Sequence, residues 1–176
     1  MATITRKDII EAFERLGQLA IGRGIKLEMA LVGGALMVLA FDARESTRDV
    51  DAITLPPSPA ATVREFAQVV ARERGWPDDW LNDGAKGYLI GLSSGPVVFK
   101  AAGIEVRSPA TAQVLAMKLS AWRDDVDISD ARHLLKVMSG KRQEVWETLE
   151  PYLVPGEELK AQYAFGDLWE SMYGHD

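Results

Sequence analysis

Two aspartates separated by one residue are the side chains in this sequence best suited to chemistry. Asp49 and Asp51 flank Val50 at the start of the apolar run 50–55. Because successive side chains of a β-strand point to opposite faces, we expect both carboxylates on one face and Val50 in the core. Adjacent carboxylates repel each other unless a cation lies between them, and Mg²⁺ or Mn²⁺ prefers such oxygen ligands. The spacing therefore predicts a divalent metal site at Asp49 and Asp51.

A diglycine lies about one structural element upstream of these acids. Gly33 and Gly34 follow the apolar run 27–32, which predicts a buried strand, and precede a predicted helix over 35–41. Glycine lets a polyphosphate approach the backbone closely, and a helix start directs free N–H groups toward it. Phosphoryl or nucleotidyl transfer needs such an amide cradle together with a carboxylate-held metal.

The remaining pattern predicts an α+β fold: a small mixed sheet flanked by helices, followed by a helical region. We expect an α/β core over 1–108 and a C-terminal helical region over 109–176 packed on it as one compact unit. Hydrophobic spacing predicts helices over 6–21, 109–122, 128–138, 141–149 and 157–172, with a further helix after Ser58. Strands are predicted over 27–32, 50–55, 88–92, 97–101 and 103–107. Thr5 and Asp8 predict a capping box, and Ser58-Pro59 and Ser108-Pro109 predict helix caps followed by proline.

The composition excludes several classes of protein. The 176 residues have a formal net charge of −6, which argues against a generally basic DNA-coating protein. Residues 140–176 carry eight acidic and three basic residues, whereas the rest is nearly balanced, so a local basic groove there stays open. There is no cysteine, and therefore no disulfide framework and no zinc–thiolate site. We see no signal peptide and no apolar run long enough to span a membrane, so we expect a cytoplasmic protein with no membrane partner.

The order strand, glycines, helix and paired aspartates resembles the nucleotidyltransferase superfamily that includes DNA polymerase beta. The run Arg44-Glu-Ser-Thr-Arg-Asp-Val-Asp51 resembles the Arg-x-Ser-Thr-x-Asp-x-Asp signature of the AbiEii/MenT-type branch. These are prokaryotic nucleotidyltransferases often encoded as toxins of toxin–antitoxin pairs. Segments 78–84 and 116–130 resemble two further elements of that branch.

The resemblance implies roles for individual residues. Asp49 and Asp51 would hold the metal, and a third carboxylate would come from Asp130, which we favour, or from Asp127 or Glu105. Lys118 would contact a nucleotide phosphate. The remaining phosphate-binding residues would be Gly33, Gly34, Ser46, Thr47 and Arg48.

Each of these residues also has a structural alternative. Asp127 would be a helix N-cap, Asp130 a first-turn acid that complements the helix dipole, and Glu105 an exposed strand residue. Lys118 would extend its stem from an apolar helix to reach water or an anion. Ser46 and Thr47 would be solvated loop residues, and Arg48 would screen the two aspartates.

The function implied is a metal-dependent enzyme that transfers NMP from an NTP to an acceptor. By resemblance the acceptor is a tRNA 3′ end or a protein hydroxyl, and the protein is a toxin with a cognate antitoxin. The alternative is a catalytically inactive nucleotidyltransferase fold that binds protein partners. Residues 91–95 match the Gly-x-Ser-x-Gly elbow of hydrolases, but a strand rather than a helix is predicted after them, which disfavours a serine hydrolase.

Overall fold

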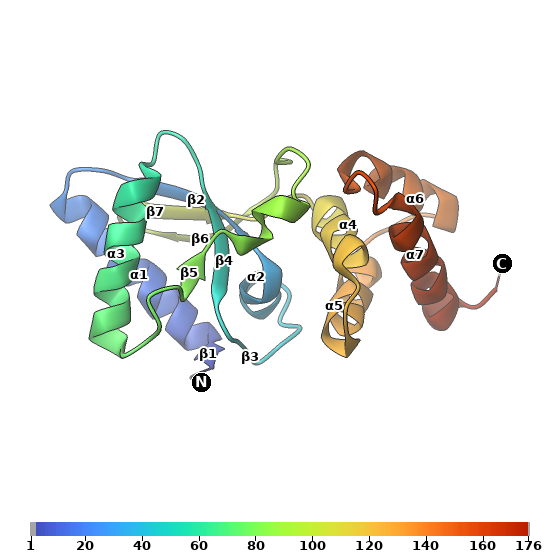
Figure 1. Cartoon of the computed structure of the whole chain (residues 1–176), viewed down its shortest axis with the longest axis horizontal. Coiled ribbons are helices and arrows are strands. Elements are labelled where there is room, and N and C mark those ends of the chain that lie inside the picture. The colour runs from blue at the N-terminus through green and yellow to red at the C-terminus, as the bar shows by residue number, and fades with distance from the viewer. Residues whose placement is uncertain (1–2, 176) are drawn as a thin grey trace. The chain divides into compact units, whose positions relative to one another are not determined.

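The computed structural model describes residues 3–175 and divides into two compact units (Figure 1). The sheet unit comprises the chain up to Lys86 together with 95–108, and the helical unit comprises 87–94 together with the chain from Pro109. The predicted α+β class is confirmed, since helices flank a mixed five-stranded sheet and only helices follow it. The helical unit takes 87–94 from a region that the sequence analysis places in the core. Within the described residues, no helix combines the length and apolar character needed to cross a bilayer.

The central sheet has the strand order β5-β4-β2-β7-β6. Its strands are β2 (Leu27–Val32), β4 (Val50–Thr54), β5 (Leu81–Asn82), β6 (Val97–Ala101) and β7 (Ile104–Arg107). The middle strand β2 pairs antiparallel with β4 and parallel with β7, while β4 pairs parallel with β5. A separate two-stranded sheet joins β1 (Ile4–Thr5) to β3 (Ser46–Thr47). Strands β4 and β5 therefore lie on one side of β2, and strands β7 and β6 lie on the other.

Helix α1 (Arg6–Gly22) packs against strands β6 and β7 of this sheet. It begins at the predicted capping box, which is confirmed: Asp8 N donates to Thr5 Oγ1, and Thr5 N donates to Asp8 Oδ2 at 2.9 Å. The ring of Phe13 packs against that of Phe99 with centroids 5.6 Å apart. The buried face of α1 comprises Ile9, Ala12, Phe13, Leu16, Gly17 and Ala20.

Helix α3 (Ala60–Arg74) connects β4 to β5 and lies beside α1 (Figure 1). Ion pairs join the two helices: Arg15 pairs with Glu73, Arg74 pairs with both Asp8 and Glu11, and Arg23, the C-cap of α1, pairs with Glu65. Such exposed pairs each contribute at most about 1 kcal/mol, so apolar packing must supply most of the stability. The buried Trp80 indole donates to Ala67 O at 2.8 Å and so fixes the chain that enters β5.

The helical unit is organised around α4 (Thr111–Ala121), which contacts each of the other helices. Those helices are α5 (Asp125–Lys136), α6 (Arg142–Leu149) and α7 (Glu158–Tyr173), with a 3₁₀ turn η2 (Glu150–Tyr152) after α6. Every residue of α4 from Gln113 to Ala121 is buried, as expected of a helix surrounded by partners.

The predicted strand 88–92 is wrong. This segment follows the 3₁₀ helix η1 (Gly84–Tyr88) and joins no sheet. Its backbone groups are instead satisfied by the fully buried side chain of Gln113, which donates to Gly91 O and accepts from Ser93 N at 2.8 Å. Ser93 Oγ in turn accepts from Ala110 N. A buried side-chain amide here replaces the pairing that a strand would have required.

Two predicted helix caps are also wrong. The N-cap of α3 is Pro59, because Ser58 Oγ accepts a hydrogen bond from Glu28 N at 2.7 Å and so ties the β4–α3 connection to β2. The N-cap of α4 is Ala110, and Ser108 N donates to Pro96 O. Ser58 and Ser108 thus lie one and two residues before the N-cap of their helices and have other partners.

The contact of α1 with the β6–β7 turn predicts the effect of Gly17→Ala. A methyl group on Gly17 would collide with Ala102 O and lie 2.9 Å from Ile104 Cγ2. We expect the free energy of unfolding to fall by about 1–3 kcal/mol, measured by urea denaturation. Gly22→Ala in the same helix is the control, because nothing lies within 4 Å of its added methyl. Equal stability of the two variants would contradict the close contact.

Candidate functional site

The register of the sheet places Asp51 between a glycine turn and an amide side chain. Asp51 pairs with Val32 of β2 on one side and with Asn82 of β5 on the other. Val32 directly precedes Gly33, where the chain turns from β2 into the short helix α2 (Gly33–Leu39). The pairing of β4 with its two neighbours therefore gathers these residues, which are far apart in sequence.

The diglycine is required at this position for both conformation and space. Gly33 has a φ of +65°, which L-residues rarely adopt, and a methyl group on it would lie 2.8 Å from Asp51 Oδ2. A methyl group on Gly34 would lie 2.6 Å from Thr47 Oγ1 and 2.8 Å from Arg44 Nη1. The bare backbone of the turn thus adjoins a carboxylate, a hydroxyl and a guanidinium.

Asp49 and Asp51 border the same short turn after β5. Asn82 Nδ2 donates to Asp49 Oδ2 at 3.1 Å, and Asn82 Oδ1 accepts from Gly84 N at 2.8 Å. A methyl group on Gly84 would lie 3.6 Å from Asp51 Oδ1. Both carboxylates are half-buried, so they combine access to solvent with fixed surroundings.

The structure brings together two residues that our role assignments omitted. Asn82 orients Asp49, and Arg44 lies at Gly34 together with the buried hydroxyl of Thr47. Both belong to segments that resemble the family, and that resemblance was the available signal. Of the other predicted phosphate ligands, Ser46 pairs with Thr5 in the β1–β3 sheet, and Arg48 is exposed. We refer to Gly33, Gly34, Arg44, Thr47, Asp49, Asp51 and Asn82 as the aspartate site.

The chemistry of the aspartate site suits a hard divalent cation. Its acidic donors are the carboxylates of Asp49 and Asp51, and magnesium commonly uses one or two carboxylates together with substrate phosphates. Within residues 3–175, no group of three or more His, Cys, Asp or Glu side chains could hold a metal. Asp49 and Asp51 would therefore hold an ion with help from a phosphate-bearing ligand, next to a backbone that glycine leaves open.

Glu105 does not fit the predicted role of a third metal ligand. It lies on β7 opposite Glu28 of β2, four residues from Val32, or about 13 Å along the strand from the position of Asp51. Its carboxylate is only 7% exposed and forms ion pairs with Lys26, Lys100 and Arg107, so it is also not the exposed strand residue considered above. The hydrogen bond from Lys26 is the main reason that the pKa of Glu105 lies below its usual value.

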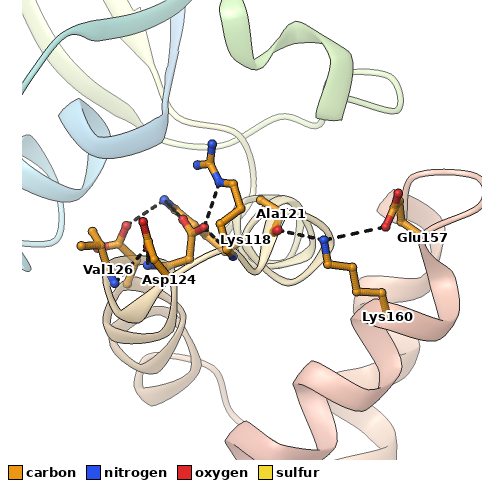
Figure 2. A network of polar contacts seen from close by, with 9 residues as sticks. Lys118, Ala121, Asp124, Val126, Glu157 and Lys160 are labelled. Atoms are coloured by element: carbon orange, nitrogen blue, oxygen red, sulfur yellow. Dashed lines mark hydrogen bonds and ion pairs between the residues drawn. The ribbon is translucent and has the colours of Figure 1, made fainter.

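The other two candidates for a third carboxylate form a buried cluster with Lys118 in the helical unit (Figure 2). Lys118 Nζ lies 2.7 Å from Asp130 Oδ2 and 3.2 Å from Asp127 Oδ1. Arg123 donates to Asp127 Oδ2 from both its backbone N and its Nε, at 3.1 and 3.2 Å. Asp127 and Asp130 are 2% and 1% exposed. We call these four residues the lysine cluster. Its charges neutralise one another, which is the condition for burying them.

The structural alternatives considered for these aspartates are wrong in detail. Asp124, not Asp127, is the N-cap of α5, and its Oδ1 accepts from the backbone N of Val126 and of Asp127 (Figure 2). Asp130 lies beyond the first turn of α5, where it pairs with Lys118. At the same, C-terminal end of α4, Lys160 donates to Ala121 O at 3.0 Å and so satisfies a terminal carbonyl. The lysine cluster thus joins α4 to α5, and Lys160 joins α4 to α7.

Comparison of the sequence with protein-family models and with curated proteins finds no match.

The lysine cluster predicts an acid-dependent loss of stability. Burial raises the pKa of Asp127, but Lys118 and Arg123 outweigh this and hold it below its usual value. The charged Asp127 therefore adds its full contribution to the free energy of unfolding at pH values above about 3.9, the pKa of the unfolded state. That contribution is lost as the pH falls through the lower pKa of the folded state. We expect Asp127→Asn to reduce the free energy of unfolding by about 1–3 kcal/mol at pH 7.

This difference should shrink on acidification, because Asn cannot titrate. Urea denaturation of both proteins from pH 7 to pH 2 measures it. Asp125→Asn on the exposed side of α5 is the control and should stay close to wild type. A difference between wild type and Asp127→Asn that is independent of pH would contradict the charged pairing.

Proposed function

We propose that this chain is a metal-dependent nucleotidyltransferase that moves NMP from an NTP to a hydroxyl acceptor. The observation that carries the proposal is the placement of Asp51 against the Gly33-Gly34 turn, with Asp49, Arg44 and Thr47 around them. Two carboxylates suit a metal ion, the bare turn suits close approach of a phosphate, and the guanidinium and hydroxyl suit its oxygens.

In the proposed reaction, an acceptor hydroxyl attacks the α-phosphorus of the NTP and loses its proton. A new oxygen–phosphorus bond forms, the bond between the α-phosphorus and its bridging oxygen breaks, and pyrophosphate leaves. Asp49 and Asp51 would hold Mg²⁺ or Mn²⁺, which supplies charge neutralisation for the phosphates. Asn82 fixes the position of Asp49, and Arg44 and Thr47 bind phosphate oxygens beside the diglycine.

The contact of Lys118 with a nucleotide phosphate stays a prediction. In the structure the Lys118 side chain forms ion pairs with Asp127 and Asp130. Its ammonium is neutralised by Asp127 and Asp130. In our proposal the phosphate contacts of the sheet unit come from Arg44 and Thr47, while the lysine cluster fixes α4 on α5. This neutralisation is also the observation that favours the alternative function, a nucleotidyltransferase fold that binds protein partners without turnover.

Asp51→Asn tests the proposed activity directly. We expect it to reduce incorporation of labelled NMP into total tRNA, or into protein, by at least about 100-fold, because a neutral amide no longer holds the metal. Glu45→Gln is the matched control, since it removes an exposed carboxylate from the preceding loop. Circular dichroism confirms that both variants fold.

The result also separates the two functions. Equal labelling by wild type and Asp51→Asn would exclude the assigned metal site. If wild type neither labels an acceptor nor binds any NTP with Mg²⁺ in isothermal titration calorimetry, the enzymatic proposal fails and the binding module stands.

The resemblance to the AbiEii/MenT-type branch extends the proposal to a toxin that modifies a tRNA 3′ end in the cytoplasm and is countered by an antitoxin. We expect expression of wild type to arrest bacterial growth, because blocked tRNA ends stop translation, and Asp49→Ala to relieve the arrest. Growth curves after induction, with protein levels matched by immunoblot, measure the effect. Normal growth at high wild-type expression would reject the toxin role and leave the transferase proposal in place.

A further inference from the structure

A second hollow lies in the sheet unit, between α3 and the β4–β5 edge of the sheet. It has a volume of about 280 Å³ and a floor made by Ala52, Val63, Ala67 and Leu81. Small-molecule pockets span roughly 300–1,000 Å³, so this volume suits a small ligand. Ala52 and Asp51 point to opposite faces of β4, so the floor of the hollow lies on the face opposite Asp51, while Asn82 of the aspartate site also lines the hollow. We call it the α3–β5 cavity.

Charged side chains of both signs surround the apolar floor. Arg64 lines the cavity from α3, and Asp78, Asp79 and Asp83 line it from the segment around β5. Within the described residues none of these four side chains forms an ion pair with another residue, so Arg64 and the aspartates are more than 4.0 Å apart.

The distance between the two kinds of charge can be read from α3. The indole of Trp80, which directly follows Asp79, is hydrogen-bonded to Ala67 O, so Asp78 and Asp79 lie near that turn of the helix. Arg64 is three residues earlier, about 5 Å along the axis. The backbone positions of Arg64 and of the two aspartates thus lie about one helical turn apart along α3, and all three residues line the cavity.

We propose that the α3–β5 cavity binds a short zwitterion whose ammonium and carboxylate groups are separated by an apolar chain, that is, an ω-amino acid. Its carboxylate pairs with Arg64, its methylene groups lie on Ala52, Val63, Ala67 and Leu81, and its ammonium lies among Asp78, Asp79 and Asp83. An α-amino acid carries both charges on one carbon and satisfies only one end. The proposal does not depend on the proposed function, because its charged contacts, Arg64 and the three aspartates of the cavity, are not among the residues assigned to metal or phosphate.

The probe is 5-aminovalerate, titrated into the full chain by calorimetry and by two-dimensional ¹H–¹⁵N NMR. Pentylamine and valerate each lack one charged end, and norvaline carries both charges on one carbon. We expect saturable binding of 5-aminovalerate at least about tenfold tighter than that of any of the three, with NMR shifts in α3 and around β5.

Variants of each charged end complete the test. Arg64→Met should weaken binding of 5-aminovalerate by at least about tenfold, whereas Arg72→Met, an exposed arginine of the same helix outside the cavity, should not. The double variant Asp78→Asn with Asp79→Asn should also weaken it, whereas Asp42→Asn should not. Absence of saturable binding, equal binding of a one-ended analogue, or unchanged binding by Arg64→Met would each overturn the proposal.

Discussion

The pairing of β4 with two strands of opposite direction is the constraint on which the aspartate site depends. Antiparallel pairing with β2 sets Asp51 beside Val32, and parallel pairing with β5 sets it beside Asn82. A shift of one residue in the pairing of β4 with either neighbour would turn the Asp51 side chain to the face of the sheet on which α3 lies. Asp51 would then no longer adjoin the Gly33-Gly34 turn. The backbone ladder, rather than any side-chain contact, thus determines which groups meet, and Gly33 then supplies the space.

Two ionic groups outside the aspartate site are each built around a single side chain of low exposure. Glu105 is surrounded by Lys26, Lys100 and Arg107, and Lys118 is held by two buried aspartates. Glu105 and Lys118 each have partners of opposite charge, which is what their low exposure demands. Asp49 and Asp51 are half-buried, with an amide as the described partner of Asp49. Their access to solvent and the pair of acidic oxygen donors are the features that suit an external divalent cation.

Sequence reasoning succeeded where the determining interactions are local and failed where they are not. The apolar run of β2 ends at glycine and the capping box of α1 spans four residues, so both are readable from neighbouring positions. The segment 88–92 has a strand-like composition, but Gln113, more than twenty residues later, satisfies its backbone. The sequence predicted that Glu105 lies on a strand but not how far it lies from Asp51, which only the register of β7 on β2 determines. The predicted need of Lys118 for an anion agrees with its two partners, although the pattern did not say which acids they are.

The bond network around Gln113 has a consequence for how the polypeptide can be divided. The chain passes from the sheet unit to the helical unit at 87, returns at 95, and leaves again after 108. A fragment ending at Ser108 would keep the segment around Ser93 but lose the amide that pairs with its peptide groups. Because the chain crosses between the units three times, neither unit is encoded by one continuous stretch of the gene. During synthesis, the segment around Ser93 can pair with Gln113 only after α4 has been made. No single cut in the gene would therefore separate the two units intact.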